Sequence, residues 1–147
     1  MTGAVIALSV KQPAIVILLA FASHFVLDMI PHFGIYEDDV IRRNRNWLFR
    51  TVVTIDIIIM LALLVIVPHL AAAKLAWGIV LAGMISALSP DLLWVPMFIR
   101  EVRTKQWRSG GRFVTFHQSI QKFEKPIGLI VELVWLIATS FIFAQLI

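Results

Sequence analysis

Long apolar segments alternate with short polar ones along the chain, and four of the apolar segments are long enough to cross a bilayer. A helix spans the hydrocarbon core with about 20 residues. The four segments cover about residues 13–30, 48–67, 75–99 and 126–147. Pro13 and Pro126 suit the first turn of a helix, where a backbone N–H is not needed. The first segment also has an apolar extension that begins near Gly3.

A fifth, shorter helix is indicated between the third and fourth segments. Apolar residues recur there at helical spacing, at Phe113, Phe116, Ile120 and Phe123. Polar side chains occupy the rest of the helical wheel, which is typical of a helix that lies in the membrane interface. We therefore predict an all-α fold: a polytopic membrane helix bundle of about four transmembrane helices with one interfacial helix, in a single domain of residues 1–147.

Composition supports lipid as the solvent of this chain. Of its 147 residues, 60% are hydrophobic and only 15% are charged, whereas a soluble domain has about a quarter of charged residues. The chain has no cysteine, which excludes disulfides and thiolate metal sites. Residues 1–10 lack the basic start of a signal peptide, so we expect the first segment to be retained.

The basic residues give an orientation. Eleven of the 13 lysines and arginines fall between segments one and two, at the start of segment two, or between segments three and four, and only Lys11 and Lys74 fall elsewhere. The positive-inside rule then predicts cytoplasmic loops at residues 32–47 and 100–125, with both termini outside the cell membrane. The net charge of +4 is explained by anionic lipid headgroups as partners. No nucleic-acid partner is expected, because the aromatic residues of the basic loops are not interleaved in a way that favours nucleic acid over anionic lipid.

The two halves of the chain show a weak internal sequence similarity. A shift of 63 residues places Lys11 on Lys74, Ser23 on Ser86 and Asp28 on Asp91 without a gap. Two interpretations stay open. Either residues 11–67 and 74–147 are two copies of one antiparallel helix pair in the same orientation, as in parallel membrane repeats, or three matches in apolar segments are coincidence.

The strongest candidate chemistry lies at the end of the first segment. His24 and Asp28 are four residues apart and share one helix face. His32 would extend the row if the helix passed Pro31. Imidazole and carboxylate at this spacing can hold a divalent ion, and both are costly at membrane depth unless paired or functional. The alternative is a histidine–aspartate hydrogen bond at a helix end.

Three more ionisable residues fall in the same half of the predicted membrane, and a fourth lies on the interfacial helix. Asp91, after Pro90, is either a second carboxylate ligand or a residue that favours the start of a new helical turn. Asp56 and Glu132 either pair with nearby basic residues or provide ligation or proton transfer. His117, on the interfacial helix, is either an aromatic anchor or a ligand or acid–base group that a lid brings over the site.

Three short stretches resemble the motifs of a known family. Ser23-His24 to Asp28, Ser89-Pro90-Asp91 and Thr115 to Ser119 are similar to the SHxxxD, PDxDH and THS motifs of the membrane-bound metal-dependent hydrolases, which include the LexA-regulated inner-membrane hydrolase. The motif order differs here, and Leu93 and Trp94 stand where the family has Asp and His. The resemblance implies a divalent metal and a hydrolytic reaction, with His24 and Asp28 matched best, Asp91 less well and His117 weakly.

These observations predict a metal-dependent hydrolase at the cytoplasmic face that acts on an amphiphile with a phosphate group. The expected metal ligands are His24, Asp28, Asp91 and His32, and the expected catalytic groups are Asp56, Glu132 and His117. Zinc is the first expectation from the mixed ligand set, with manganese or magnesium for a carboxylate-dominated site. The alternative is a non-enzymatic ion-binding, transport or assembly protein, and transport through only four helices would favour a homodimer.

Overall fold

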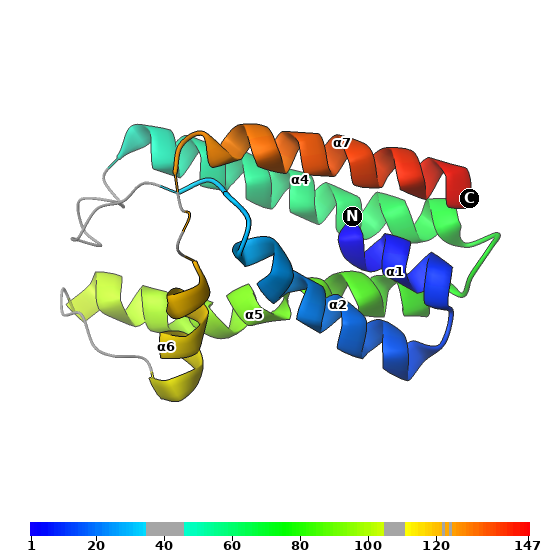
Figure 1. The fold of residues 1–147 in the computed structure, drawn as a ribbon, viewed down its shortest axis with the longest axis horizontal. Helices are drawn as coiled ribbons and strands as arrows, with labels where there is room; N and C mark the ends of the chain where they lie inside the picture. The colour runs from blue at the N-terminus through cyan, green and yellow to red at the C-terminus, as the bar shows by residue number, and fades with distance from the viewer. Residues whose placement is uncertain (35–45, 105–110, 122, 124) are drawn as a thin grey trace.

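The protein is an all-α bundle, as predicted. The computed structural model describes residues 1–34, 46–104, 111–121, 123 and 125–147. The helices within these residues are α1 (Thr2–Val10), α2 (Pro13–Asp28), α4 (Trp47–Ala71), α5 (Trp77–Thr104), α6 (Gly111–Ile120) and α7 (Gly128–Leu146). Helices α2 and α5 run in one direction, and α4 and α7 run in the opposite one (Figure 1). This orientation agrees with a repeated helix pair, although the duplication itself stays a prediction.

The apolar extension near Gly3 forms a helix of its own. Lys11 ends α1 in the left-handed conformation, at φ 61°. Gln12 then caps α2, because its side-chain oxygen accepts a hydrogen bond from the Ile15 amide at 2.7 Å. The chain therefore reverses between Val10 and Pro13, and α1 folds back along α2. Continuous hydropathy across this segment concealed the break.

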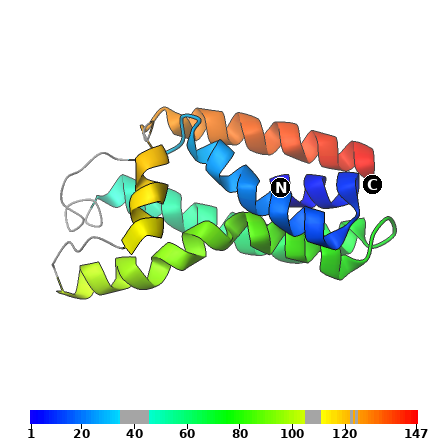
Figure 2. The same cartoon turned by 60° about the horizontal axis from the view of Figure 1, so that its bottom comes forward.

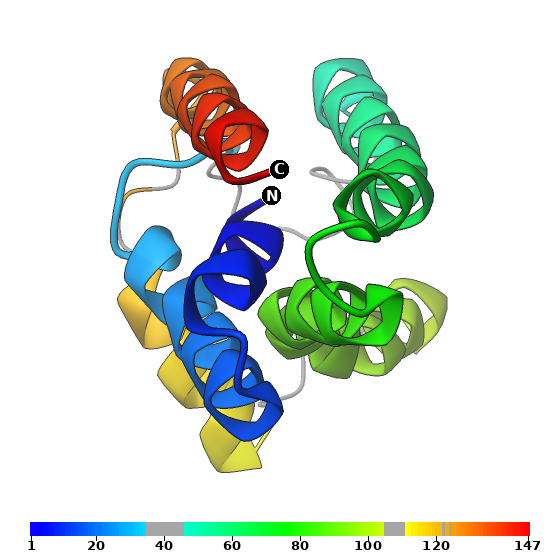
Figure 3. The same cartoon turned by 90° about the vertical axis from the view of Figure 1, so that its right-hand side faces the viewer.

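Helix α1 fills one half of the bundle. In the end-on view it lies between α7, α2 and α5 (Figure 3). Close approach to α5 depends on two glycines, because a Cβ added to Gly83 would lie 2.7 Å from the carbonyl oxygen of Gly3. The buried core gathers around this helix and comprises Ala4, Ala7, Leu8, Val16, Val67, Ala71, Val80, Met84 and Phe143.

The other half of the bundle holds little buried apolar surface. No residue of α4 before Val67 is buried, and α7 buries only Gly128 before Thr139. Large apolar side chains point outward along both helices, for example Ile58 at 61% and Ile137 at 69% exposure. Both helices, with 25 and 19 residues, are long and apolar enough to cross a membrane, while α2 and the Trp77–Leu93 part of α5 are shorter apolar helices.

Helix α6 confirms that the segment between the third and fourth apolar segments is helical. It is steeply inclined to the long helices and lies beside the ends of α2 and α5 (Figures 1 and 2). Rings join it to α2, since Phe25 contacts Phe113 at a centroid distance of 6.3 Å and Phe116 at 5.5 Å. This packing brings the face of α6 that carries His117 against the end of α2.

Candidate metal centre

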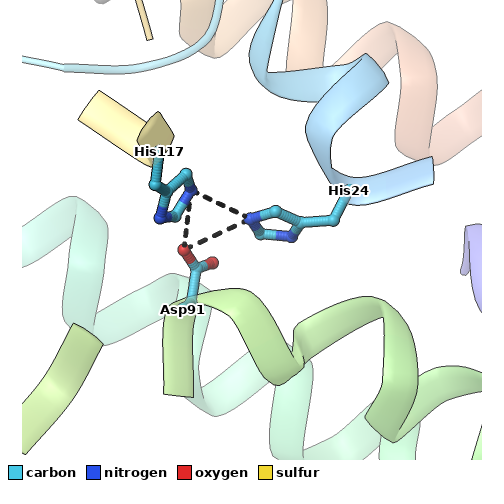
Figure 4. A group of neighbouring side chains, drawn as sticks. All are labelled: His24, Asp91 and His117. Carbon is cyan, nitrogen blue, oxygen red and sulfur yellow. Dashed lines mark hydrogen bonds and ion pairs between the residues drawn. The ribbon is translucent and has the colours of Figure 1, made fainter. Parts of the chain in front are cut away.

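Four ionisable side chains from three helices meet at the end of α2. His24 and Asp28 come from α2, Asp91 from α5 and His117 from α6. Figure 4 shows His24, Asp91 and His117 pointing toward one another from their separate helices. One ligand atom from each of these three lies within 4.8 Å of the other two. Asp28 joins them, because its Oδ2 is 3.4 Å from His24 Nε2 and 2.7 Å from His117 Nε2.

The spacing of the atoms suits a single small ion. Ligands about 2.0–2.1 Å from a tetrahedral ion are about 3.3 to 3.4 Å apart. His24 Nε2 is 3.4 Å from the Nε2 of His117, 3.4 Å from Asp91 Oδ1 and 3.4 Å from Asp28 Oδ2. The His117–Asp91 distance is longer, at 4.0 Å. The 2.7 Å contact between His117 and Asp28 is shorter and has the length of a charge-assisted hydrogen bond.

The backbone of α5 orients His24. Its Nδ1 donates a hydrogen bond to the carbonyl oxygen of Ala87 at 2.9 Å, and a carbonyl can only accept. The proton on Nδ1 leaves Nε2 of the neutral ring as a lone pair directed into the cluster. This arrangement is the usual support of a histidine that binds a metal.

Pro90 explains how α5 presents Asp91. Proline has no N–H, so the carbonyl of Ser86 loses its helical partner one turn earlier. The Ser89 hydroxyl replaces it and donates to that carbonyl at 2.8 Å. Asp91 therefore follows a locally satisfied proline turn inside a helix, and the interpretation of a new helix start is not needed.

Burial divides the cluster into a closed and an open side. The side chains of His117, His24 and Asp28 are 4%, 11% and 14% exposed, whereas that of Asp91 is 60% exposed. The rings of Phe25 and Phe113 lie against His117 on the closed side. A small molecule can therefore approach the cluster past Asp91, whereas His117 is covered on the side of α6.

His32, predicted as a further ligand, lies outside the group. Helix α2 ends at Asp28, so the row of side chains does not continue, and His32 Nδ1 instead meets the carbonyl of Ile30 at 3.0 Å. The His32 carbonyl accepts from the Lys125 amide at 3.1 Å. His32 thus belongs to the segment of residues 31–33, here called the strap, which is hydrogen-bonded to the start of α7 through Lys125.

The two remaining carboxylates also lie apart from the ligand atoms. Glu132 accepts a hydrogen bond from the amide of Phe33 at 2.7 Å and so helps to hold the same strap. Asp56 is exposed on α4, and its negative charge and that of Asp91 repel each other. Among the residues that the structure describes, no lysine or arginine forms an ion pair with either of them. A role in proton transfer stays a prediction for both.

Two contributors were not singled out from the sequence. Phe25 forms ring contacts with His24 and His117, and Gln121 places its amide nitrogen 3.3 Å from His117 Nε2. Gln121 could have been found by spacing, since it follows His117 by four residues as Asp28 follows His24. Phe25 could not, because it is one of many aromatic residues in apolar segments.

Comparisons with known proteins do not indicate a function for this chain, so a function can be argued only from the geometry of the site. No protein-family model, no curated protein and no solved structure matches this chain.

Proposed function

We propose that this protein is a multi-pass membrane protein that holds one divalent ion between His24, Asp28, Asp91 and His117. The convergence of two imidazole nitrogens and two carboxylates from three helices carries this proposal. In hydrocarbon, such groups are tolerated when they pair or bind an ion. Two histidines and two aspartates fit zinc first, and manganese or magnesium as carboxylate-preferring alternatives.

The arrangement of the bundle supports a membrane location with the site near one face. The starts of α4 and α7 and the end of α5 lie at one end of the bundle, and the α1–α2 and α4–α5 turns lie at the other (Figure 1). Lys11 and Lys74 belong to those turns, whereas Arg50, Arg103 and Lys125 lie near the first end. The positive-inside rule favours the cytoplasm for that first end. The inclined α6 is oriented as an interfacial helix would be.

The reaction best suited to this centre is hydrolysis of an amphiphile. With four protein ligands in place, a substrate oxygen would take a fifth coordination position on the ion, and the exposure of Asp91 supplies an approach to it. Leu92 and Leu93, next to it on α5, are 52% and 60% exposed. An acyl chain could lie against these side chains while its headgroup reaches the ion. A bound ion would polarise a phosphoryl oxygen and lower the pKa of a bound water.

The experiment that tests this function is metal analysis followed by a hydrolysis assay. Protein purified in detergent should contain about one divalent ion per chain by mass spectrometry of the elements. The His24→Ala variant should lose it, and His69→Ala should keep it, because His69 contacts its own helix at Val65 and the ring of Trp77. Loaded protein should then release phosphate from phosphatidate in mixed micelles, and His24→Ala should not.

The 2.7 Å contact between His117 and Asp28 favours a second candidate, a non-enzymatic assembly or ion-binding protein. A hydrogen-bonded histidine–aspartate cluster can join α6 to α2 without an ion. Wild-type protein that is purified without metal and still shows a fully helical circular-dichroism spectrum would support this candidate and reject the metal centre. Metal-loaded protein without hydrolysis would reject the enzyme and keep the ion site.

A further inference from the structure

Gln121 faces the cluster from the closed side. It follows α6 directly, is partly buried, and its Nε2 lies 3.3 Å from Nε2 of His117. The same histidine nitrogen lies 2.7 Å from Asp28 and 3.4 Å from His24. The Gln121 amide is therefore directed at a ligand nitrogen of the cluster that also contacts Asp28 and His24.

The histidine nitrogen cannot serve as the lasting acceptor for this amide. With an ion in place, the lone pair of His117 Nε2 is used in the metal bond. Without an ion, the short contact to Asp28 requires a proton on Nε2, because an ionised carboxylate only accepts. In both states the Gln121 N–H needs another acceptor, because a donor without a hydrogen-bond partner in a partly buried site is destabilising.

An oxygen bound to the ion would meet this need. An ion about 2 Å from His117 Nε2 would be within about 5 Å of the Gln121 nitrogen. A ligand oxygen about 2 Å from the ion can then lie at hydrogen-bonding distance from the amide, about 2.9 Å. A neutral donor is suited to this place, since it adds no charge beside two carboxylates and two imidazoles.

We propose that Gln121 is a substrate-binding residue that donates a hydrogen bond to a phosphoryl oxygen bound at the metal centre. This inference rests on the proposed metal site and deepens it by naming the group that the site recognises. The N–H would hold the oxygen on the side of α6, so that the remaining phosphoryl substituents, including an ester-linked chain, would extend past exposed Asp91.

The test uses cobalt-loaded full-length protein in detergent and inorganic phosphate as the probe. Binding of phosphate at the ion shifts the visible absorption of Co²⁺, which gives a dissociation constant without any assay of activity. Gln121→Ala should keep the cobalt stoichiometry and the starting spectrum while weakening phosphate binding about 10- to 100-fold, as expected for a hydrogen bond to a charged group. Gln145→Ala, which changes an exposed glutamine of α7, is the matched control.

The variant Gln121→Glu provides a second test of the same hydrogen bond. The side chain keeps its size, but the carboxylate repels phosphate, so binding should be lost while cobalt is retained. Acetate, titrated in parallel, shows whether the site prefers a phosphoryl group or any oxyanion, and equal loss of acetate binding in Gln121→Ala would overturn the phosphoryl assignment. Unchanged phosphate affinity in Gln121→Ala, loss of cobalt in that variant, or a wild-type spectrum that phosphate does not shift would each overturn the inference. Failure of the wild-type protein to bind cobalt would instead reject the proposed function.

Discussion

The Ser86 hydroxyl donates a hydrogen bond to the carbonyl oxygen of Ile17 at 2.8 Å and thereby joins α5 to α2. Ile17 lies two helical turns before His24, and Ser86 lies five residues before Asp91. Because the two helices run in the same direction (Figure 1), this bond fixes their relative register. It brings the nitrogen of His24 level with the carboxylate of Asp91.

Removal of this hydroxyl should loosen the site without destroying the bundle. We expect Ser86→Ala to lower the free energy of unfolding by about 1 kcal/mol, the net value of one hydrogen bond, and to weaken metal binding several-fold. Ser9→Ala is the control, because the Ser9 hydroxyl bonds to Val5 within its own helix. Titration of metal into both purified variants makes the comparison, and equal metal affinities would contradict the assigned role of Ser86.

Two glycines of α5 should respond in opposite ways to alanine. A Cβ on Gly83 would meet the Gly3 carbonyl oxygen at 2.7 Å and Val16 Cγ1 at 2.9 Å, whereas a Cβ on Gly78 has no neighbour within 4 Å. Gly83→Ala should destabilise the protein by about 1–3 kcal/mol through overpacking. Gly78→Ala should be neutral or stabilising by up to about 1 kcal/mol, because alanine favours helix.

Thermal unfolding of the two alanine variants in the same detergent provides the measurement. If both variants melted at the temperature of the wild-type protein, α1 would not be seated against α5 as described.

Metal should stabilise α6 on the bundle. The helix contributes His117 to the cluster and otherwise contacts α2 through the rings around Phe25. Amide hydrogen exchange in a peptide covering residues 111–120 should therefore slow when zinc is added. His117→Ala should abolish this response, while the end of α7 should exchange equally with and without zinc. Slowing of equal size in the His117→Ala variant would show that zinc acts elsewhere.

Orientation in the membrane can be tested by labelling. Cysteines introduced at Asn44 and Ser109 should not react with an impermeant maleimide added to intact cells, because the basic loops are predicted to be cytoplasmic. Both positions lie outside the described residues, so this prediction comes from the sequence alone. A cysteine in place of Ala73, in the α4–α5 turn, should react. Ready labelling at Ser109 together with protection at Ala73 would invert the topology.

Hydropathy and helical spacing predicted most of the architecture. The four apolar segments became α2, α4, α5 and α7 with ends that differ by a few residues, since a run of about 20 apolar residues leaves few alternatives. The break at Lys11 was missed because a left-handed residue and a side-chain cap leave no trace in hydropathy. The burial of α1 also could not be foreseen, as it depends on the contact between Gly3 and Gly83.

The candidate site was predictable where spacing within one helix decided it. His24 and Asp28 share a face by helical geometry alone, and Asp91 was expected at a similar depth. The part played by His117 depends on how α6 folds over the end of α2, which is set by ring contacts between segments about 90 residues apart. His32 was predicted as a ligand on the assumption that the helix continues past Pro31. In the structure α2 ends at Asp28, and His32 is hydrogen-bonded to the start of α7 instead.

The nearly isosteric change Asp28→Asn separates the metal centre from a purely structural cluster. An amide keeps the size of the side chain and can still form a hydrogen bond with His117, now 2.7 Å from the carboxylate oxygen. It is a much poorer ligand, because it has no negative charge to offer a divalent ion. For a metal centre, Asp28→Asn should lower zinc affinity at least about 100-fold and leave the helical spectrum unchanged.

For a structural cluster, the same variant should change little, whereas Asp28→Ala should destabilise the protein by about 1–3 kcal/mol because it leaves a buried histidine donor without its partner. Zinc titration followed by thermal unfolding of both variants distinguishes the two cases. A loss of zinc in Asp28→Asn at unchanged apo stability would show that the negative charge of Asp28 helps to hold the ion. Unchanged zinc affinity in that variant would remove Asp28 from the ligand set and leave His24, Asp91 and His117 as the centre.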